Sequence, residues 1–207
     1  MLDRFKAFWQ GVVLAPIINL LIRLKVSPDV VTFVGTVGVA VGALAFYPHG
    51  HLFWGTIFIT CFVFSDLVDG AMARKTGRTP GASLFGQFWD STLDRIGDGA
   101  IFAGLALYFA GPGDSTLYLW LSLICLVMGA VTSYARAKAE SIGLKAEVGI
   151  AERSDRLVAI LVMTGLGDLF NFMFLCKLTL WALAIASTIT VCQRVWVVRK
   201  QALAVDR

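Results

Sequence analysis

The sequence has little of the chemistry on which most soluble metal sites and redox enzymes depend. It holds two histidines and four cysteines in 207 residues. The cysteines are scattered through apolar runs, and neither a CxxC pair nor a Cys/His metal-site spacing is present. We interpret them as small apolar residues rather than as disulfide partners or metal ligands. The net charge of +4 is too modest to indicate a nucleic-acid partner.

Polar residues are scarce as well. Hydrophobic residues make up 57% of the chain and the mean hydropathy is +0.76, whereas soluble domains have about 45–50% apolar residues. We therefore expect an integral membrane protein, with one domain over residues 1–207. No internal repeat or low-complexity segment is visible. A cleavable signal peptide is not expected, because the amphipathic first residues are followed by more charge and not by a cleavage site.

Six apolar segments qualify as membrane spans, since a helix needs roughly 20 residues to cross the hydrocarbon core. Residues rich in Gly, Pro and charge separate most of them, as is typical of turns. The predicted fold class is an all-α integral membrane protein with a six-helix bundle over 28–200. The segments are, approximately, 30–47, 52–72, 84–110, 116–138, 155–175 and 178–198.

The basic residues predict the orientation of these spans. All but Lys177 of the 18 lysines and arginines fall on one side of the predicted membrane. The positive-inside rule then places both termini in the cytoplasm, together with the connections at 74–83 and 137–155. An even number of spans agrees with this placement.

Residues 1–25 have a different character from the spans. They mix Trp, Phe and Leu with spaced Arg and Lys, and Pro16 interrupts them. This pattern is typical of an amphipathic interfacial helix that lies on the cytoplasmic leaflet. The alternative is a seventh span, which would move the C-terminal basic cluster to the other side of the membrane.

Four aspartates follow a helical pattern beside the longest apolar runs. Asp66 and Asp69 are three residues apart, and Asp90 and Asp94 are four apart, so each pair shares a helix face. A short connection makes the two helices antiparallel neighbours, and the four carboxylates can converge at one depth. Unpaired, they would repel one another. A hard divalent cation such as Mg²⁺ or Mn²⁺ would bind them and relieve this repulsion.

A purely structural interpretation of these aspartates also exists. In it they are ordinary interfacial residues that pair with Arg74 and Arg95. Asp98 continues the face of the second pair, where it would either hydrogen-bond the site or pair with a basic side chain. Gly70 and Gly86, which lie close to the aspartates in sequence, would let a ligand or a helix backbone approach closely.

The aspartates and their neighbours also match a family pattern. Asp66-x2-Asp69-Gly70-x2-Ala73-Arg74, followed by Gly86-x3-Asp90-x3-Asp94, resembles the motif of the CDP-alcohol phosphatidyltransferases. The likeness covers nearly the whole chain. It implies that a CDP-linked lipid gives its phosphatidyl group to an alcohol and that CMP is released. One departure is the connection at 75–85, whose eleven residues exceed the family's usual length.

The resemblance also implies roles for individual residues. Asp66, Asp69 and Asp90 would be the principal ligands of Mg²⁺ or Mn²⁺, with two ions in each active site. Asp94 would lie by the second ion and act as the general base on the acceptor hydroxyl. Phosphoryl transfer fits such a site, because it needs charge neutralised on a diphosphate and a leaving group held in line.

The segment "VSPDVVTFVG" at 26–35 resembles a family segment too. By that likeness Asp29 and Thr32 would approach the cytidine end of the donor lipid, CDP-diacylglycerol. The same stretch is equally a helix start, since Ser27 and Pro28 suit an N-cap and a first helical position. From the main motif, the donor-binding residues implied are Asp66, Gly70, Ala73 and Arg74.

Basic residues at the cytoplasmic ends of the last three spans bear on the acceptor. Ordinary positive-inside flanking charge is one interpretation. A phosphorylated acceptor is the other, because guanidinium groups bind phosphate bidentately. The pattern resembles that of the phosphatidylinositol phosphate synthases of actinobacteria, which use inositol 1-phosphate. The residues this likeness places around the acceptor phosphate are Ser133, Arg136, Lys138, Arg153 and Arg194.

Two alternatives stay open at this stage. A phosphatidylglycerophosphate synthase would use glycerol 3-phosphate, which also carries a phosphate. A metal or proton-coupled transporter would also have intramembrane carboxylates, although such sites usually lie near the bilayer midplane. The family resemblance further implies a homodimer, which we expect in a bacterial plasma membrane in contact with membrane lipids. The orientation given by the basic residues places the active site on the cytoplasmic side.

Overall fold

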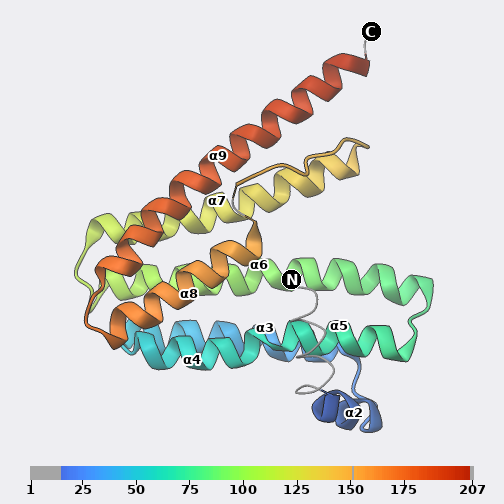
Figure 1. Ribbon diagram of the computed structural model, residues 1–207, viewed down its shortest axis with the longest axis horizontal. Coiled ribbons are helices and arrows are strands. Elements are labelled where there is room, and N and C mark those ends of the chain that lie inside the picture. Colours follow the sequence, from blue (N-terminus) through green and yellow to red (C-terminus); the bar gives the residue numbers. More distant parts are fainter. Residues whose placement is uncertain (1–14, 151, 206–207) are drawn as a thin grey trace. The chain divides into compact units, whose positions relative to one another are not determined.

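The computed structural model describes residues 15–150 and 152–205, except for the side chain of Asp66. All regular secondary structure assigned in this part of the chain is helical (Figure 1). The all-α fold class is therefore confirmed. The helices are α2 (Ala15–Arg23), α3 (Pro28–Phe46), the 3-10 helix η2 (Tyr47–His49), α4 (Leu52–Val63), α5 (Ser65–Thr76), α6 (Pro80–Ala110), α7 (Thr116–Ser141), α8 (Arg153–Leu169) and α9 (Phe174–Val205).

The chain divides into two compact units. The first comprises the residues up to Val41 together with Phe58–Gly97, and the second comprises Gly42–Ile57 with Asp98–Arg207. The first unit therefore contains α2, α5 and the N-terminal parts of α3 and α6. The second contains α7, α8 and α9. A single membrane domain over 1–207 stays a prediction.

In the first unit, α2 packs against α5. Ile18 of α2 is fully buried together with Val68 and Met72 of α5. Ile17 and Leu20, on the same short helix, are exposed. Residues 1–14 of the expected interfacial helix lie outside the described residues, so the described part of that helix is α2.

Small residues let the helices approach closely in each unit. In the first unit, a Cβ atom on Gly35 of α3 would lie 2.9 Å from Cβ of Ser65, at the start of α5. In the second unit, a Cβ on Gly104 of α6 would lie 2.6 Å from the carbonyl oxygen of Ala43. Both contacts are shorter than a side chain tolerates, so glycine is required for the observed packing.

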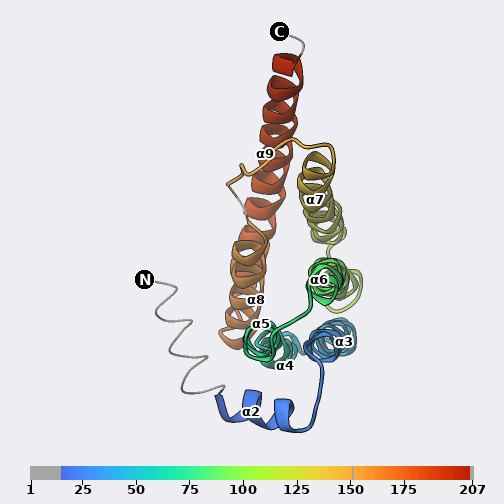
Figure 2. The same ribbon diagram turned by 90° about the vertical axis from the view of Figure 1, so that its right-hand side faces the viewer.

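The second unit is built around α9, which packs along α7 and α8 (Figures 1 and 2). Cys125 of α7 contacts the carbonyl oxygen of Leu180, and Thr164 of α8 donates to the sulfur of Cys176, both within the buried core. All four cysteines are free. Cys125 and Cys176 therefore serve as small core residues on these helices, whereas Cys61 and Cys192 are exposed.

Within residues 15–150 and 152–205, four helical segments are long and apolar enough to cross a membrane: Pro28–His49, Leu52–Thr76, Thr116–Ser141 and Phe174–Ala204. The protein is therefore a multi-pass membrane protein. The two other expected spans correspond to α6 and α8, which do not meet this criterion. The expected span at 84–110 carries Asp90, Asp94, Arg95 and Asp98, and α8 has only 17 residues.

Several expected boundaries were wrong. The connection expected at 74–83 is confined to 77–79, because α6 already begins at Pro80. Thr79 caps that helix, since its hydroxyl accepts from the backbone N–H of Ala82 at 3.3 Å. The span expected at 155–175 ends at Leu169, and Asn171 in the following turn has a positive φ of 52°.

Candidate active site

Asp69 of α5 is the best-defined carboxylate of the first unit. Its side chain is buried, and its Oδ2 accepts a 2.6 Å hydrogen bond from the hydroxyl of Thr32 on α3. The same hydroxyl lies 3.1 Å from the carbonyl oxygen of Pro28. Because a hydroxyl has one proton, the shorter contact identifies the carboxylate as the main acceptor. Thr32 therefore fixes the orientation of Asp69.

Asp90 and Asp94 lie one turn apart on α6. Asp90 is exposed and near enough to Asp69 for the two carboxylates to repel each other. Asp94 is 16% exposed and its Oδ2 lies 3.5 Å from the guanidinium of Arg95. The purely structural interpretation expected this arginine beside the aspartates. Asp66 lies one turn before Asp69 on α5, and its side chain is outside the described part of the chain.

The donor set of this site suits a hard cation. Among the described side chains, no group of three or more His, Cys, Asp and Glu residues is arranged to hold a metal ion. Asp66 is not among these described side chains. Carboxylate oxygens are the ligands that Mg²⁺ and Mn²⁺ prefer. The residues present therefore fit a divalent metal.

Asp29, in the first turn of α3, is held by two residues that the sequence did not reveal. Its Oδ1 accepts from Arg78 Nη2 at 2.7 Å, and its carbonyl oxygen accepts from the indole N–H of Trp89 at 3.1 Å. Arg78 lies in the turn between α5 and α6. These partners are 49 and 60 residues away in sequence, so no local spacing could have indicated them.

The other predicted donor-binding residues lie along α5. Gly70 is half-buried, and a Cβ atom there would be 3.6 Å from Nη1 of Arg74. Ala73 is half-buried and Arg74 is exposed. Small residues thus alternate with a long basic side chain that extends over Gly70.

In the second unit, Asp98 of α6 pairs with Arg153 at the start of α8. Arg153 Nε donates to both carboxylate oxygens, at 3.1 and 3.3 Å. Of the two roles considered for Asp98, the structure shows the pair with a basic side chain. Arg153, a predicted ligand of the acceptor phosphate, is therefore already engaged by a carboxylate.

The predicted acceptor residues of α7 are engaged locally. Arg136 pairs with Glu140 at 2.9 Å and with Glu147 at 3.8 Å. The hydroxyl of Ser133 donates to the carbonyl oxygen of Gly129 at 3.3 Å, within its own helix. Lys138 is exposed. A phosphate bound by Arg136 would therefore compete with two glutamates.

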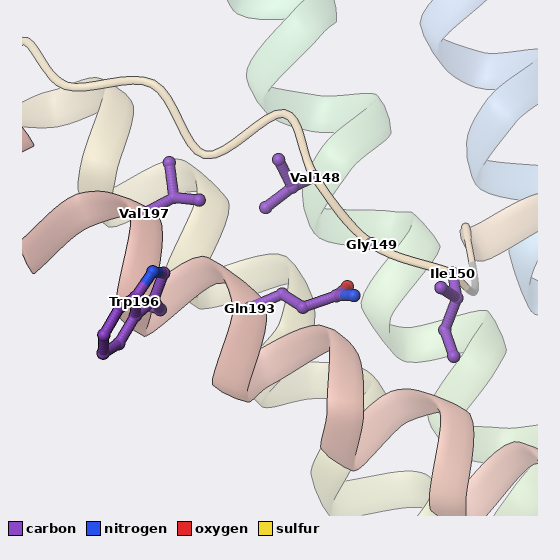
Figure 3. Close-up of a pocket in the computed structure, with 6 residues that line it drawn as sticks. All are labelled: Val148, Gly149, Ile150, Gln193, Trp196 and Val197. Carbon is purple, nitrogen blue, oxygen red and sulfur yellow. The ribbon is translucent and has the colours of Figure 1, made fainter. Parts of the chain in front are cut away.

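Arg194 of α9 is buried and binds backbone. Its guanidinium donates to the carbonyl oxygens of Val148, at 3.0 Å, and of Thr132. Beside it lies an open cavity of about 390 Å³ (Figure 3). Gln193 extends toward Gly149 and Ile150 in this cavity. The residues that line the cavity are Val148, Gly149, Ile150, Gln193, Trp196 and Val197.

A family model described as CDP-alcohol phosphatidyltransferase matches residues 25–193 of the chain. Among curated proteins, a phosphatidylinositol phosphate synthase of Streptomyces avermitilis is 50% identical, over 100% of this chain and 86% of its own length. One from Cutibacterium acnes is 49% identical, over 97% of this chain and 98% of its own length.

The chain is also similar to solved structures of a phosphatidylinositol phosphate synthase. The crystal structure of Mycobacterium tuberculosis phosphatidylinositol phosphate synthase with CDP-DAG bound aligns with a TM-score of 0.82 and 41% identity. It covers 88% of this chain and 92% of that one. The same enzyme in complex with manganese and citrate aligns with a TM-score of 0.80 and 41% identity, and covers 88% and 87% of the two chains.

Proposed function

Since the chain belongs to the CDP-alcohol phosphatidyltransferase family, we propose that this enzyme is a phosphatidylinositol phosphate synthase. It transfers the phosphatidyl group of CDP-diacylglycerol to a hydroxyl of inositol 1-phosphate, and CMP leaves. The observation that carries this proposal is the 50% identity, over the full length of the chain, to a protein of that name. The transporter alternative has no comparable support.

The carboxylates of the first unit are the proposed metal ligands. Asp66, Asp69, Asp90 and Asp94 would hold two Mg²⁺ or Mn²⁺ ions, and the relative solved with manganese supports a divalent metal. Bound there, the ions would neutralise the charge of the diphosphate. Thr32 holds Asp69 in one orientation before any ligand binds. This preorganisation avoids reorienting a buried carboxylate during turnover.

Asp94 is the proposed general base. It takes the proton from the acceptor hydroxyl as that oxygen forms its bond to phosphorus, while the bond between phosphorus and the CMP oxygen breaks. The guanidinium of Arg95, at 3.5 Å, partly balances the charge of the carboxylate. A base that is mostly screened from water suits this step, because bulk water would compete with the acceptor.

The donor would be bound by residues of α3 and α5, and a relative solved with CDP-DAG bound supports this substrate. Arg74 is exposed and can pair with phosphate. Gly70 and Ala73 leave the adjacent helix surface open. The proposed donor-binding residues are Asp29, Thr32, Asp66, Gly70, Ala73 and Arg74.

The acceptor phosphate would be bound in the second unit. Arg136 and Arg153 already bind carboxylates, and the guanidinium fork that binds a carboxylate can also bind two oxygens of a phosphate. A phosphate would replace Glu140 and Asp98 as the partner of these groups. Arg194 supports the segment around Val148. The proposed set is Ser133, Arg136, Lys138, Arg153 and Arg194.

In the proposed membrane arrangement, six segments cross the bilayer, the four apolar segments and two more. In this arrangement α6 and α8 also cross the bilayer, and the pair between Asp98 and Arg153 lowers the cost of placing charge in them. The helix α2 lies in the cytoplasmic interface, where exposed Ile17 and Leu20 can enter lipid. Both termini and the active site face the cytoplasm of a bacterial plasma membrane, and the enzyme is a homodimer.

An acceptor comparison tests the proposed function. Purified enzyme in detergent, with Mg²⁺ and CDP-diacylglycerol, is given inositol 1-phosphate, inositol or glycerol 3-phosphate, and CMP release is measured. Of the three acceptors, we expect only inositol 1-phosphate to support rapid CMP release. Release with glycerol 3-phosphate but not with inositol 1-phosphate would instead identify a phosphatidylglycerophosphate synthase.

A further inference from the structure

We propose that Arg78 is a positioning residue for the donor lipid, held in the space that Gly86 leaves open, where it orients the carboxylate of Asp29. The proposal rests on the proposed function, in which Asp29 contacts the donor. It assigns a role to an arginine that lies outside the aspartate motif. It also gives a specific reason for glycine at position 86.

The contact between Arg78 and Asp29 is well formed. Nη2 lies 2.7 Å from Oδ1, and the two side chains are 18% and 30% exposed. Nη1 lies 3.4 Å from the carbonyl oxygen of Ala82, in the first turn of α6. Arg78 therefore joins the turn before α6 to the first turn of α3, and solvent screens the ion pair only partly.

Gly86 is the residue that admits this guanidinium. It is buried on α6, and a Cβ atom there would clash with Nη1 of Arg78 and lie 3.0 Å from its Cζ. The same atom would lie 3.5 Å from Oδ1 of Asp29, which is an ordinary contact. An alanine at this position would displace only the far end of a flexible side chain. The backbone of α6 would stay in place.

Other contacts hold the backbone around Asp29. The indole N–H of Trp89 donates to its carbonyl oxygen at 3.1 Å. Trp89 also stacks with Phe33 and Phe85, at centroid distances of 6.2 and 5.8 Å. Removal of Arg78 would therefore release the Asp29 carboxylate and leave the first turn of α3 anchored. The consequence should appear in donor binding rather than in folding.

Steady-state kinetics can isolate this effect. Arg78→Ala and Gly86→Ala should each raise the KM for CDP-diacylglycerol about tenfold, the usual effect of losing a hydrogen bond to a charged group. The kcat and the KM for inositol 1-phosphate should stay near wild type. Gly81→Ala is the matched control, because a Cβ atom at Gly81 meets nothing within 4 Å. Arg78→Lys should recover part of the loss, since it keeps the charge.

The double variant Arg78→Ala with Gly86→Ala gives the decisive comparison. Without the guanidinium, the alanine at position 86 has little to displace, so the double variant should be no worse than Arg78→Ala alone. If the rise in the KM for CDP-diacylglycerol in the double variant equals the product of the rises in the two single variants, the proposal is overturned, because Gly86 would then act independently of Arg78. An unchanged KM for the donor in either single variant would overturn it as well.

A binding measurement separates this proposal from the proposed function. The melting temperature of the purified enzyme is followed as CDP is added without any acceptor, since a ligand of the folded state raises it. Arg78→Ala should need about tenfold more CDP for the same rise. An unchanged CDP titration would contradict the role of Arg78. Failure of the wild type to use inositol 1-phosphate would contradict only the proposed function.

Discussion

Thr32 and Asp69, 37 residues apart in sequence, are joined by a 2.6 Å hydrogen bond from the threonine hydroxyl to Oδ2 of the aspartate. Both residues are buried. The bond links α3 to α5. Thr32, near the start of α3, therefore orients Asp69, a proposed metal ligand on α5.

Replacement of Thr32 by valine tests this link. Thr32→Val keeps the shape of the side chain and removes the hydroxyl, so Asp69 loses the hydrogen bond that Thr32 donates to its Oδ2. We expect metal affinity and activity to fall about 10- to 100-fold, as for other residues that orient metal ligands. Mn²⁺ binding, followed by electron paramagnetic resonance, measures the affinity without turnover.

Thr32→Ser is the matched control, because it keeps the hydroxyl and removes only a methyl group. It should bind Mn²⁺ within a small factor of the wild type. Equal affinities for the serine and valine variants would show that the hydrogen bond to Asp69 has no part in metal binding.

The positions of the aspartates could be predicted because helical periodicity is local. Residues three or four apart share a face on any helix, so the pairs on α5 and α6 needed no tertiary information. The start of α6 could also have been found, since Thr79 and Pro80 form an N-cap and a first helical position. That signal was hidden by the Gly, Pro and Thr content of the connection.

The remaining features depend on contacts between distant segments. Arg78 meets Asp29 across 49 residues, and Asp98 meets Arg153 across 55, which no local pattern encodes. The end of α8 was missed for another reason. Apolar residues continue through the turn after Leu169, so hydropathy does not mark the end of the helix. Only Asn171, whose type tolerates a positive φ, marked the turn.

Asp94→Asn tests the general base. The amide keeps the size of the side chain but cannot take a proton, so the fold and much of the metal binding should remain. We expect kcat to fall about 10²- to 10⁴-fold. Asp155→Asn, an exposed site on α8, controls for the loss of one carboxylate. Near-normal CMP release by Asp94→Asn would exclude the proposed role.

Asp66→Asn tests a metal ligand on α5. Loss of one anionic oxygen should weaken Mg²⁺ binding, so the activity curve should shift to higher Mg²⁺ concentrations, by about tenfold or more. Excess Mg²⁺ should restore part of the activity. This behaviour differs from that expected of Asp94→Asn, which no metal concentration should rescue. A Mg²⁺ titration that matches the wild type would show that Asp66 is not a ligand.

Arg194→Ala tests the buried guanidinium of α9. It removes the donor to the carbonyl oxygens of Val148 and Thr132. We expect the free energy of unfolding to fall by about 2 to 4 kcal/mol, since unsatisfied buried acceptors are costly. Thermal unfolding in detergent measures the change. Arg199→Ala, exposed on the same helix, should unfold like the wild type, and an equally stable Arg194→Ala would contradict the role of Arg194 in stability.

The central claim is metal-dependent transfer of a phosphatidyl group, and product stoichiometry tests it most directly. Purified enzyme receives CDP-diacylglycerol, inositol 1-phosphate and Mg²⁺, and CMP and phosphatidylinositol phosphate are both quantified by mass spectrometry. We predict one lipid product for each CMP, with both abolished by EDTA and restored by excess Mg²⁺. Release of CMP without the new lipid, or formation of both in EDTA, would contradict the account.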